Sequence, residues 1–268
     1  MKTTLYATIW ASALLCLTTF ISCGQSDGSS QNNSQPAVTE TTTQPAVEST
    51  VPAVDLGLSV KWAPYNVGAD KPEDPGYYYA WGETKGMGEE DKSNGQNYIA
   101  NDSLSFVRNR YDWVNYKYCQ GTATTLTKYC HNAEAGKVDG KLVLAKEDDV
   151  AQVVMGGSWR MPTKEELSEL RSNCQWTWTV LNGVAGYTVV GPNGNSIFLP
   201  AAGCRSNQSR GLVSDRGPKH EGGGDYWSSN ISKEEDSRLA WRLIFGQDVV
   251  SYNYESRCEG ACVRAVCN

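Results

Sequence analysis

Cysteine is the residue type in this chain whose positions point most directly to chemistry. Cys23 follows the basic residue Lys2, an uncharged run over residues 5–21 and the small residue Ser22. This order is typical of a lipoprotein signal peptide, whose cysteine becomes the first residue of the mature chain and carries the lipid. We therefore predict a lipoprotein signal peptide over residues 1–22, lipidation of Cys23 by acyl chains such as palmitate, and export of the protein.

Two other interpretations of this segment stay open. An ordinary cleaved secretory peptide fits the order as well, because Phe20 stands where a lipobox prefers leucine. A spanning anchor needs about 20 predominantly apolar residues, whereas residues 5–21 are fewer and include serine and threonine. All three interpretations export the chain. We expect a cell-envelope protein, lipid-anchored in the outer membrane, on its periplasmic or its surface side.

Seven further cysteines lie in the rest of the chain. In an exported protein this number favours disulfide bonds, up to three of them with one thiol left over. Several pairings are possible, and the short separation of Cys119 and Cys130 favours a bond between those two. The candidates for disulfide bonds are Cys119, Cys130, Cys174, Cys204, Cys258, Cys262 and Cys267.

The sequence offers few residues for catalysis or for a metal centre. Imidazole could come only from His131 and His220, and no Gly-x-Ser-x-Gly turn or glycine-rich phosphate loop is present. A metal on Cys258, Cys262 and Cys267 is disfavoured, since oxidised export compartments convert thiols to disulfides. We therefore predict no catalytic residue, no metal, no cofactor and no enzymatic activity.

The charge balance gives no sign of a nucleic-acid partner. Without residues 1–22 the chain keeps 23 of its 24 basic residues against 30 acidic ones. No lysine and arginine cluster provides the basic surface that nucleic acids require. The expected partners are the membrane, through the lipid on Cys23, and a glycan or protein ligand.

Composition divides the exported chain into a stalk and a folded domain. Residues 23–52 consist mainly of Ser, Gln, Asn, Thr, Pro, Ala and Val, without an aromatic or basic residue, and a Gln-Pro-Ala-Val motif occurs twice there. Such a segment cannot bury enough apolar surface to fold, so we predict a disordered stalk. Residues 53–268 contain eight of the nine tryptophans and form the predicted domain.

The domain is predicted to be α+β, irregular and mostly antiparallel. Leu239, Trp241, Leu243 and Phe245 alternate with their neighbours, which is the period of a half-buried strand. The Asn193-Gly194 pair between two apolar runs predicts a hairpin. Short strands are also predicted over residues 58–62, 77–81, 187–190, 196–199, 249–254 and 262–266.

One or two short helices complete the prediction. Thr163 and Glu166 have the spacing of a capping box, which predicts a helix from Lys164 to about Ser172 with an apolar face. A second helix is predicted over residues 147–154, where Asp148 and Asp149 would favour the positive end of the helix dipole. The alternative for that acidic pair is calcium binding.

The motifs of the domain, taken in order, resemble lipoproteins that carry the Fibrobacter succinogenes major paralogous domain. The similarity covers nearly all of residues 54–267. It rests on the segments Val54–Ala63, Asn66–Ala69, Tyr79–Thr84, Leu126–Cys130, Gly156–Thr163, Ile197–Gly203, Tyr226–Ser229 and Val263–Val266.

This resemblance implies a fold of the C-type-lectin-like and sulfatase-modifying-factor-like group. One branch of the group, the formylglycine-generating enzymes, uses a reactive cysteine pair with copper, and Cys258 and Cys262 are the closely spaced pair here. A structural role for this pair is preferred. Lectin-like folds tie a helix to the terminal strand, which implies a Cys174–Cys267 bond and leaves Cys204 to pair with Cys258 or Cys262.

Recognition is expected on a loop, because a scaffold of strands presents its binding residues there. The tract from Gly203 to Asp225 is rich in Gly, Ser, Asn and Arg, and a merely solvated tract is the alternative. The chain lacks the Glu-Pro-Asn and Trp-Asn-Asp motifs of sugar-binding lectins, so sugar binding rests on similarity of fold. The candidate ligand-binding residues are Arg205, Asn207, Arg210, Asp215 and Arg216.

Three functions follow, in order of preference. The first is a membrane-anchored, non-catalytic binding or adhesion module for a carbohydrate or protein ligand. The second is a structural component of the cell envelope. The third is an enzyme of the sulfatase-modifying-factor type, which copper dependence and oxidation of a peptide cysteine would reveal.

Overall fold

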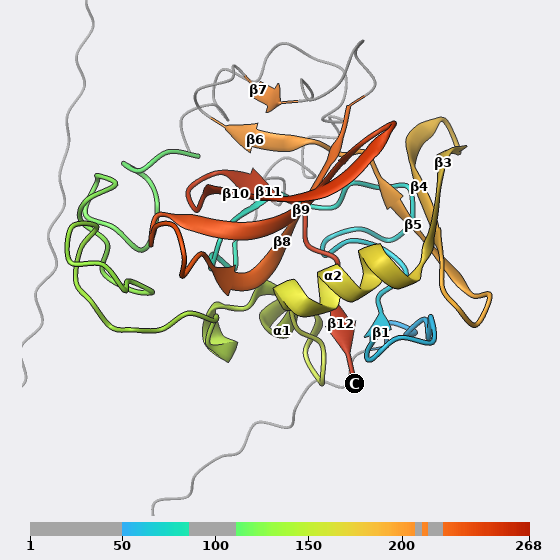
Figure 1. Ribbon diagram of the computed structural model, residues 1–268, viewed down its shortest axis with the longest axis horizontal. Coiled ribbons are helices and arrows are strands. Elements are labelled where there is room, and N and C mark those ends of the chain that lie inside the picture. The colour runs from blue at the N-terminus through green and yellow to red at the C-terminus, as the bar shows by residue number, and fades with distance from the viewer. Residues whose placement is uncertain (1–49, 86–110, 207–210, 214–221) are drawn as a thin grey trace, which may run out of the picture. The chain divides into compact units, whose positions relative to one another are not determined.

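The computed structural model describes residues 50–85, 111–206, 211–213 and 222–268 (Figure 1). The predicted signal peptide, the lipidation site Cys23 and most of the predicted stalk lie outside these residues. Of the predicted ligand-binding residues, Asn207, Arg210, Asp215 and Arg216 also lie outside them. Among the described residues no helix is long and apolar enough to cross a bilayer.

The strands form four small sheets in which every paired strand is antiparallel. The first sheet pairs β1 (Lys61–Trp62) with β12 (Val266–Cys267), and the second has the order β10 (Val249–Ser256), β9 (Leu239–Gly246), β8 (Gly224–Ile231). The third has the order β2 (Tyr79–Ala80), β11 (Gly260–Ala261), β6 (Cys204–Ser206), β7 (Gly211–Val213), and the fourth has β3 (Gln175–Leu181), β4 (Val184–Val190), β5 (Ser196–Pro200). With helices α1 (Val150–Met155) and α2 (Lys164–Asn173) beside them, these sheets confirm an α+β fold of mostly antiparallel short strands.

The predicted hairpin at Asn193-Gly194 is confirmed. β4 and β5 pair from Gly186 with Pro200 to Val190 with Ser196. Gly194 has a φ of 87°, in the left-handed region that a residue with a Cβ rarely adopts, and its amide donates to the carbonyl of Gly191 at 3.0 Å. The turn residue therefore fixes the register of this hairpin.

The predicted strand over residues 262–266 is wrong in extent. Only Val266 belongs to β12, because the backbone groups of the preceding residues bond to several different segments. The amide of Cys262 donates to Asp225, the carbonyl of Val263 accepts from Val67, and the carbonyl of Ala265 accepts from Ala63. Likewise, the predicted strand over residues 58–62 shrinks to β1.

The start of the described chain doubles back on itself. Val54 and Trp62 exchange two backbone hydrogen bonds of 2.8 and 2.9 Å, so residues 54–62 form a closed loop. Trp62 then pairs with Val266 in β12. The loop is further held to α2, where the Ser59 amide donates to the Glu169 carboxylate at 3.1 Å.

Helix α2 (Lys164–Asn173) begins as the sequence predicts. The Thr163 hydroxyl accepts from the Glu166 amide at 3.2 Å, and the Glu166 carboxylate accepts from the Thr163 amide at 2.8 Å. Arg160 also forms two hydrogen bonds to Glu166, of 2.7 and 2.5 Å, so the capping carboxylate is held in place. Leu167 and Leu170 are buried on one face of the helix.

Thr163→Ala is expected to lower the free energy of unfolding by about 1 kcal/mol, since the helix loses its N-cap acceptor. Urea unfolding of the two proteins measures this difference. Ser172→Ala, a hydroxyl deletion at an exposed position in the last turn of α2, is the control and should change stability by less than about 0.5 kcal/mol. Equal losses in the two variants would contradict the capping role.

The second predicted helix is split. A 3-10 turn, η3 (Lys146–Asp148), precedes α1 (Val150–Met155), and Asp149 caps α1 by accepting from the Ala151 amide at 2.9 Å. Asp148 has another role, because its carboxylate accepts from the Tyr129 hydroxyl at 2.6 Å and from the ammonium group of Lys128. The prediction that both acids favour the helix start is therefore correct only for Asp149.

Asp148 gives the protein an acid-sensitive contact. Burial alone would raise the pKa of this carboxyl, but hydrogen bonds from Lys128, Tyr118 and Tyr129 hold the pKa well below its usual range. The unfolded chain therefore binds the proton first, and the stability contributed by Asp148 is complete above about pH 4 and lost below it.

Urea unfolding between pH 6 and pH 3 should show a smaller loss of unfolding free energy in Asp148→Asn than in the parent protein. Equal losses would contradict this assignment, and Glu147→Gln, at an exposed carboxylate, is the control.

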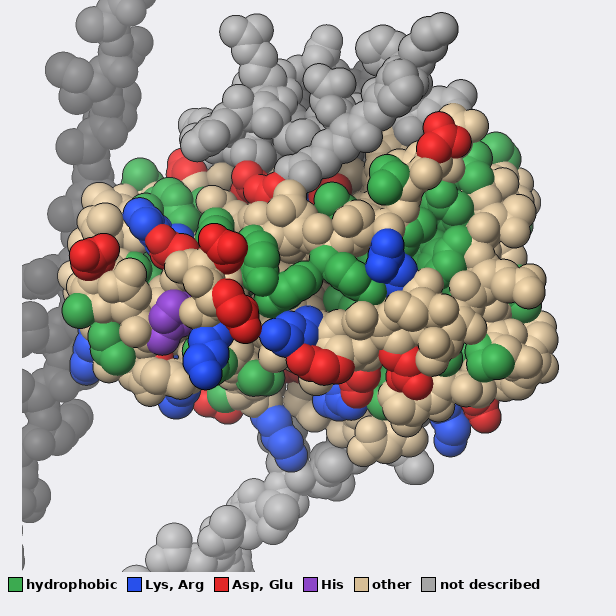
Figure 2. All heavy atoms as spheres, viewed as in Figure 1, with side chains coloured by type: hydrophobic (Ala, Val, Ile, Leu, Met, Phe, Trp, Pro, Cys, Tyr) green, Lys and Arg blue, Asp and Glu red, His purple; other side chains and the backbone are tan. Residues whose placement is uncertain are grey.

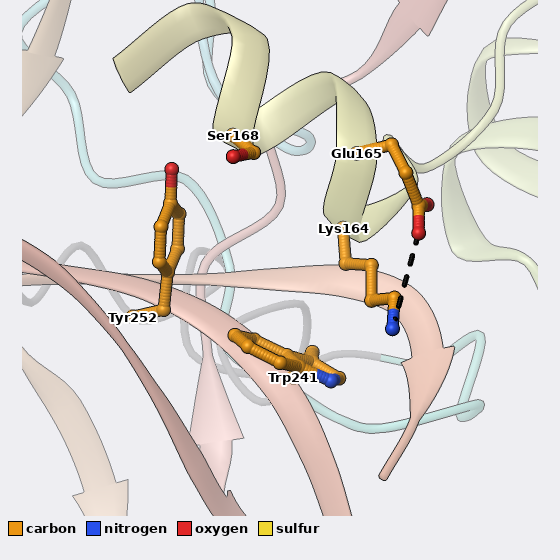
Figure 3. A pocket seen from close by; sticks show the side chains of 5 residues that line it. All are labelled: Lys164, Glu165, Ser168, Trp241 and Tyr252. Carbon is orange, nitrogen blue, oxygen red and sulfur yellow. Dashed lines mark ion pairs between the residues drawn. The ribbon is translucent and has the colours of Figure 1, made fainter. Parts of the chain in front are cut away.

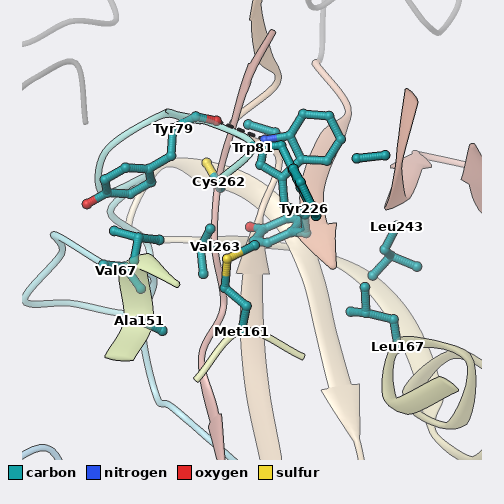
Figure 4. Close-up of a cluster of buried hydrophobic side chains, with 14 of the residues drawn as sticks. Val67, Tyr79, Trp81, Ala151, Met161, Leu167, Tyr226, Leu243, Cys262 and Val263 are labelled. Carbon is teal, nitrogen blue, oxygen red and sulfur yellow. Dashed lines mark hydrogen bonds between the residues drawn. The ribbon is translucent and has the colours of Figure 1, made fainter. Parts of the chain in front are cut away.

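The core is rich in buried tryptophan and tyrosine (Figure 4). Trp62, Trp81 and Trp227 are completely buried. The indole nitrogens of Trp81 and Trp227 donate to the carbonyls of Ser228 and Tyr79, at 2.9 and 2.8 Å. Buried indoles with satisfied N–H groups fix the relative positions of β2 and β8 in this core.

Candidate functional site

The one described member of the predicted loop site, Arg205, lies elsewhere than expected. It belongs to β6, is only 4% exposed, and its guanidinium lies over the ring of Tyr78 at 4.3 Å. The prediction of a solvent-facing Arg205 is wrong, because pairing of β6 with β11 and β7 draws the residue into the interior.

None of the predicted disulfide bonds is present. All seven candidate cysteines are among the described residues, and no disulfide joins them. The thiols of Cys119 and Cys130 face different backbone carbonyls, those of Trp113 at 2.7 Å and Asn132 at 3.0 Å. Burial raises the pKa of Cys258 to about 12 and raises that of Cys262 as well. Such thiols are protonated at neutral pH and are poor nucleophiles.

A surface pocket lies where the first turns of α2 meet β9 and β10 (Figure 3). Its volume is about 220 Å³, and it is lined by Lys164, Glu165, Ser168, Trp241 and Tyr252. We call it the α2–β9–β10 pocket. Figure 2 shows the same face of the molecule, where hydrophobic side chains form a band bordered by acidic and basic groups.

Strand register explains why the two aromatic residues share this pocket. Trp241 pairs with Tyr254, and Leu243 pairs with Tyr252, so these four side chains project from the same face of the β9–β10 ladder. On α2, Leu167 and Leu170 are buried, whereas Lys164 and Ser168 stand one turn apart and border the pocket.

The aromatic rings form a connected wall. The centroid of Trp241 lies 4.3 Å from that of Tyr254 and 5.8 Å from that of Tyr252. Two cations pack on it, Lys164 at 5.5 Å from the Trp241 centroid and Arg171 at 5.2 Å from the Tyr252 centroid. The Arg171 Nε also donates to the Val250 carbonyl at 2.8 Å, which fixes that side chain at the edge of the wall.

Polar groups of the α2–β9–β10 pocket are buried without being satisfied by the protein. The Trp241 Nε1 and the Tyr252 hydroxyl have no hydrogen-bond partner among the described residues. In Figure 3 the Tyr252 hydroxyl points toward α2, on the side of the Ser168 hydroxyl. The Lys164 Nζ lies 3.9 Å from both Glu165 and Glu234, which is longer than a hydrogen bond. The pocket therefore offers a ligand an aromatic surface, the Ser168 hydroxyl, an ammonium and a carboxylate.

No family model, no curated protein and no solved structure matches this chain.

None of the five residues that line the α2–β9–β10 pocket was predicted as a site residue. Sequence patterns placed Lys164 and Glu165 at a helix start and Trp241 in a strand. Each of these assignments depends only on residues nearby in the sequence. Tyr252 lies 87 residues from Glu165 along the chain, and no local pattern indicates that their side chains meet. The available signal was the presence of tryptophan and tyrosine at facing positions of neighbouring strands.

Proposed function

We propose that this protein is an exported lipoprotein, anchored through a lipid on Cys23, whose folded domain is a non-catalytic module that binds carbohydrate in the α2–β9–β10 pocket. The observation that carries the proposal is the pair Trp241 and Tyr252, whose aromatic rings line the pocket beside the charged groups of Lys164 and Glu165. A C-type-lectin-like fold, to which the sequence motifs point, would agree with such a role.

The chemistry of the pocket suits a sugar. A sugar ring has apolar C–H faces that pack on aromatic rings, and hydroxyls at its rim that both donate and accept hydrogen bonds. The rim of the pocket carries groups that match these hydroxyls, namely the ammonium of Lys164, the carboxylate of Glu165 and the hydroxyl of Ser168. The protein therefore favours a ligand of this type.

The proposed anchor is supported by the order of Lys2, the uncharged run, Ser22 and Cys23. Cys23→Ala is expected to leave the protein unacylated and to move it from the membrane fraction to the soluble fraction, since stable anchoring depends on acyl chains in the bilayer. Metabolic labelling with a fatty acid and cell fractionation measure both effects. Labelling that persists in this variant would contradict lipidation at Cys23, and Cys16→Ala is the control.

Glycan-array binding of the full-length protein, purified in detergent, tests the ligand class. Trp241→Ala and Tyr252→Ala should each lower affinity for the bound glycans at least about tenfold, through lost stacking on the aromatic rings. Trp178→Ala and Tyr65→Ala are the matched controls, because both residues are partly buried and lie outside the pocket. If the controls weaken binding as much as the pocket variants do, the binding site lies elsewhere. If the protein binds protein ligands and no glycan, the ligand class is protein rather than carbohydrate.

A further inference from the structure

We infer that the α2–β9–β10 pocket selects a single uncharged terminal sugar ring, and that Lys164 and Glu165 together set this preference by forming hydrogen bonds with its hydroxyls. The inference rests on the proposed function and names the substrate class of the same site. It follows from the size of the pocket, the balance of charge at its rim and the open geometry of the Lys164–Glu165 ion pair.

Size limits the ligand to one ring. The pocket has a volume of about 220 Å³, which is below the roughly 300–1,000 Å³ of sites that enclose drug-sized molecules. Trp241 and Tyr252 line one side, and Ser168 with the first turn of α2 lines the other (Figure 3). A terminal sugar can enter with its ring against Trp241 while the remainder of a glycan stays outside.

Charge at the rim disfavours both kinds of ion. An anionic sugar would meet the carboxylates of Glu165 and Glu234, each 3.9 Å from the Lys164 Nζ, and these two acids balance the charges of Lys164 and Arg171 around the pocket. A cationic ligand would compete with Lys164 and Arg171, which already pack on the rings of Trp241 and Tyr252. An uncharged ring avoids both conflicts.

The Lys164–Glu165 ion pair has the geometry to bind hydroxyls. At 3.9 Å the Nζ and the carboxylate oxygen are too far apart for a direct hydrogen bond. Lys164 is one-third exposed and Glu165 two-thirds exposed, so both can approach a ligand. The ammonium can donate to one sugar hydroxyl while the carboxylate accepts from a neighbouring one, and hydrogen bonds with a charged partner are the strong ones.

The test compares three ligand series on the full-length protein by titration calorimetry. The series are oligosaccharides that end in a neutral hexose, in the corresponding uronic acid and in the corresponding amino sugar. We expect the neutral series to bind at least about tenfold more tightly than either charged series, with little dependence on salt. Glu165→Gln and Lys164→Met should each weaken neutral binding about tenfold, the loss of one hydrogen bond to a charged group.

Matched variants separate selection from folding. Glu147→Gln, at an exposed carboxylate that does not line the pocket, should leave binding unchanged, and circular dichroism checks that each variant is folded. Glu165→Lys reverses the rim charge and should raise the affinity for the uronic-acid series relative to the neutral one.

The outcomes distinguish the two proposals. If the protein binds the neutral series most tightly and Trp241→Ala abolishes this binding, both proposals are supported. Tighter binding of uronic acids or amino sugars, still abolished by Trp241→Ala, overturns the selection inferred here and leaves the carbohydrate site in place. Absence of binding in all three series, or binding that Trp241→Ala does not affect, overturns the carbohydrate site itself.

Discussion

Replacing Arg242 with methionine is expected to lower the free energy of unfolding by about 3–5 kcal/mol. The Arg242 side chain is completely buried, and its guanidinium lies 3.1 Å from Asp225, 3.2 Å from Glu255 and 3.5 Å from Glu259. Methionine fills part of the volume but leaves three carboxylates near one another without this cation. Thermal and urea unfolding of the parent protein and the variant measure the loss.

Two further substitutions control this prediction. Arg238→Met removes an arginine that pairs with Asp236 but whose side chain is 41% exposed, and it should cost at most about 1 kcal/mol. Arg242→Lys keeps the charge but loses the planar fork, so its cost should fall between the other two. If Arg242→Met loses no more free energy of unfolding than Arg238→Met does, the stability of the buried cluster does not depend on its cation.

Trp227→Ala is the second change with a large expected effect, a loss of about 3–5 kcal/mol. The side chain is completely buried, its Nε1 donates to the Tyr79 carbonyl at 2.8 Å, and the Arg242 guanidinium lies 5.4 Å from its ring centroid. Alanine would leave a cavity between β8 and β2 and would remove the indole donor to the Tyr79 carbonyl. Urea unfolding gives the difference in free energy.

Trp227→Phe separates the two contributions, because it keeps most of the ring and removes only the N–H. Its loss should be clearly smaller, about 1–2 kcal/mol. The double variant Trp227→Ala, Arg242→Met should lose less than the sum of the two single losses, since the side chains are in contact. Strict additivity would contradict their coupling.

Local patterns in the sequence predicted the elements that local chemistry determines. The start of α2 depends on Thr163 and Glu166, three residues apart, and the β4–β5 turn depends on Gly194. In contrast, β8 was missed because its sequence, Gly-Asp-Tyr-Trp-Ser-Ser-Asn-Ile, does not alternate between apolar and polar residues. It is buried along nearly its whole length, with its polar residues inside, so its burial depends on contacts with distant segments.

Buried charge shows the same limit at the level of single residues. Arg205 was predicted to be a loop residue because arginine beside Gly, Ser and Asn is usually solvated. Its burial depends on Tyr78, and that of Arg257 depends on carbonyls of Lys128, Tyr129 and Ser237. These partners lie 20 to 129 residues away in the sequence, and no spacing rule connects them. The α2–β9–β10 pocket was missed for the same reason.

The loop closed by Val54 and Trp62 has a mechanical consequence for a protein held at Cys23 as proposed. Tension along the stalk reaches the domain through Val51, which packs against the core, and through the two backbone hydrogen bonds between Val54 and Trp62. If these bonds yield, residues 55–61 can straighten only when the buried side chains of Leu56 and Val60 leave the core. The load is therefore shared at once by the core and by the two residue pairs of β1 and β12. The loop thus ties the start of the domain to its interior, so that a pull on the tether must expose apolar surface before this segment lengthens.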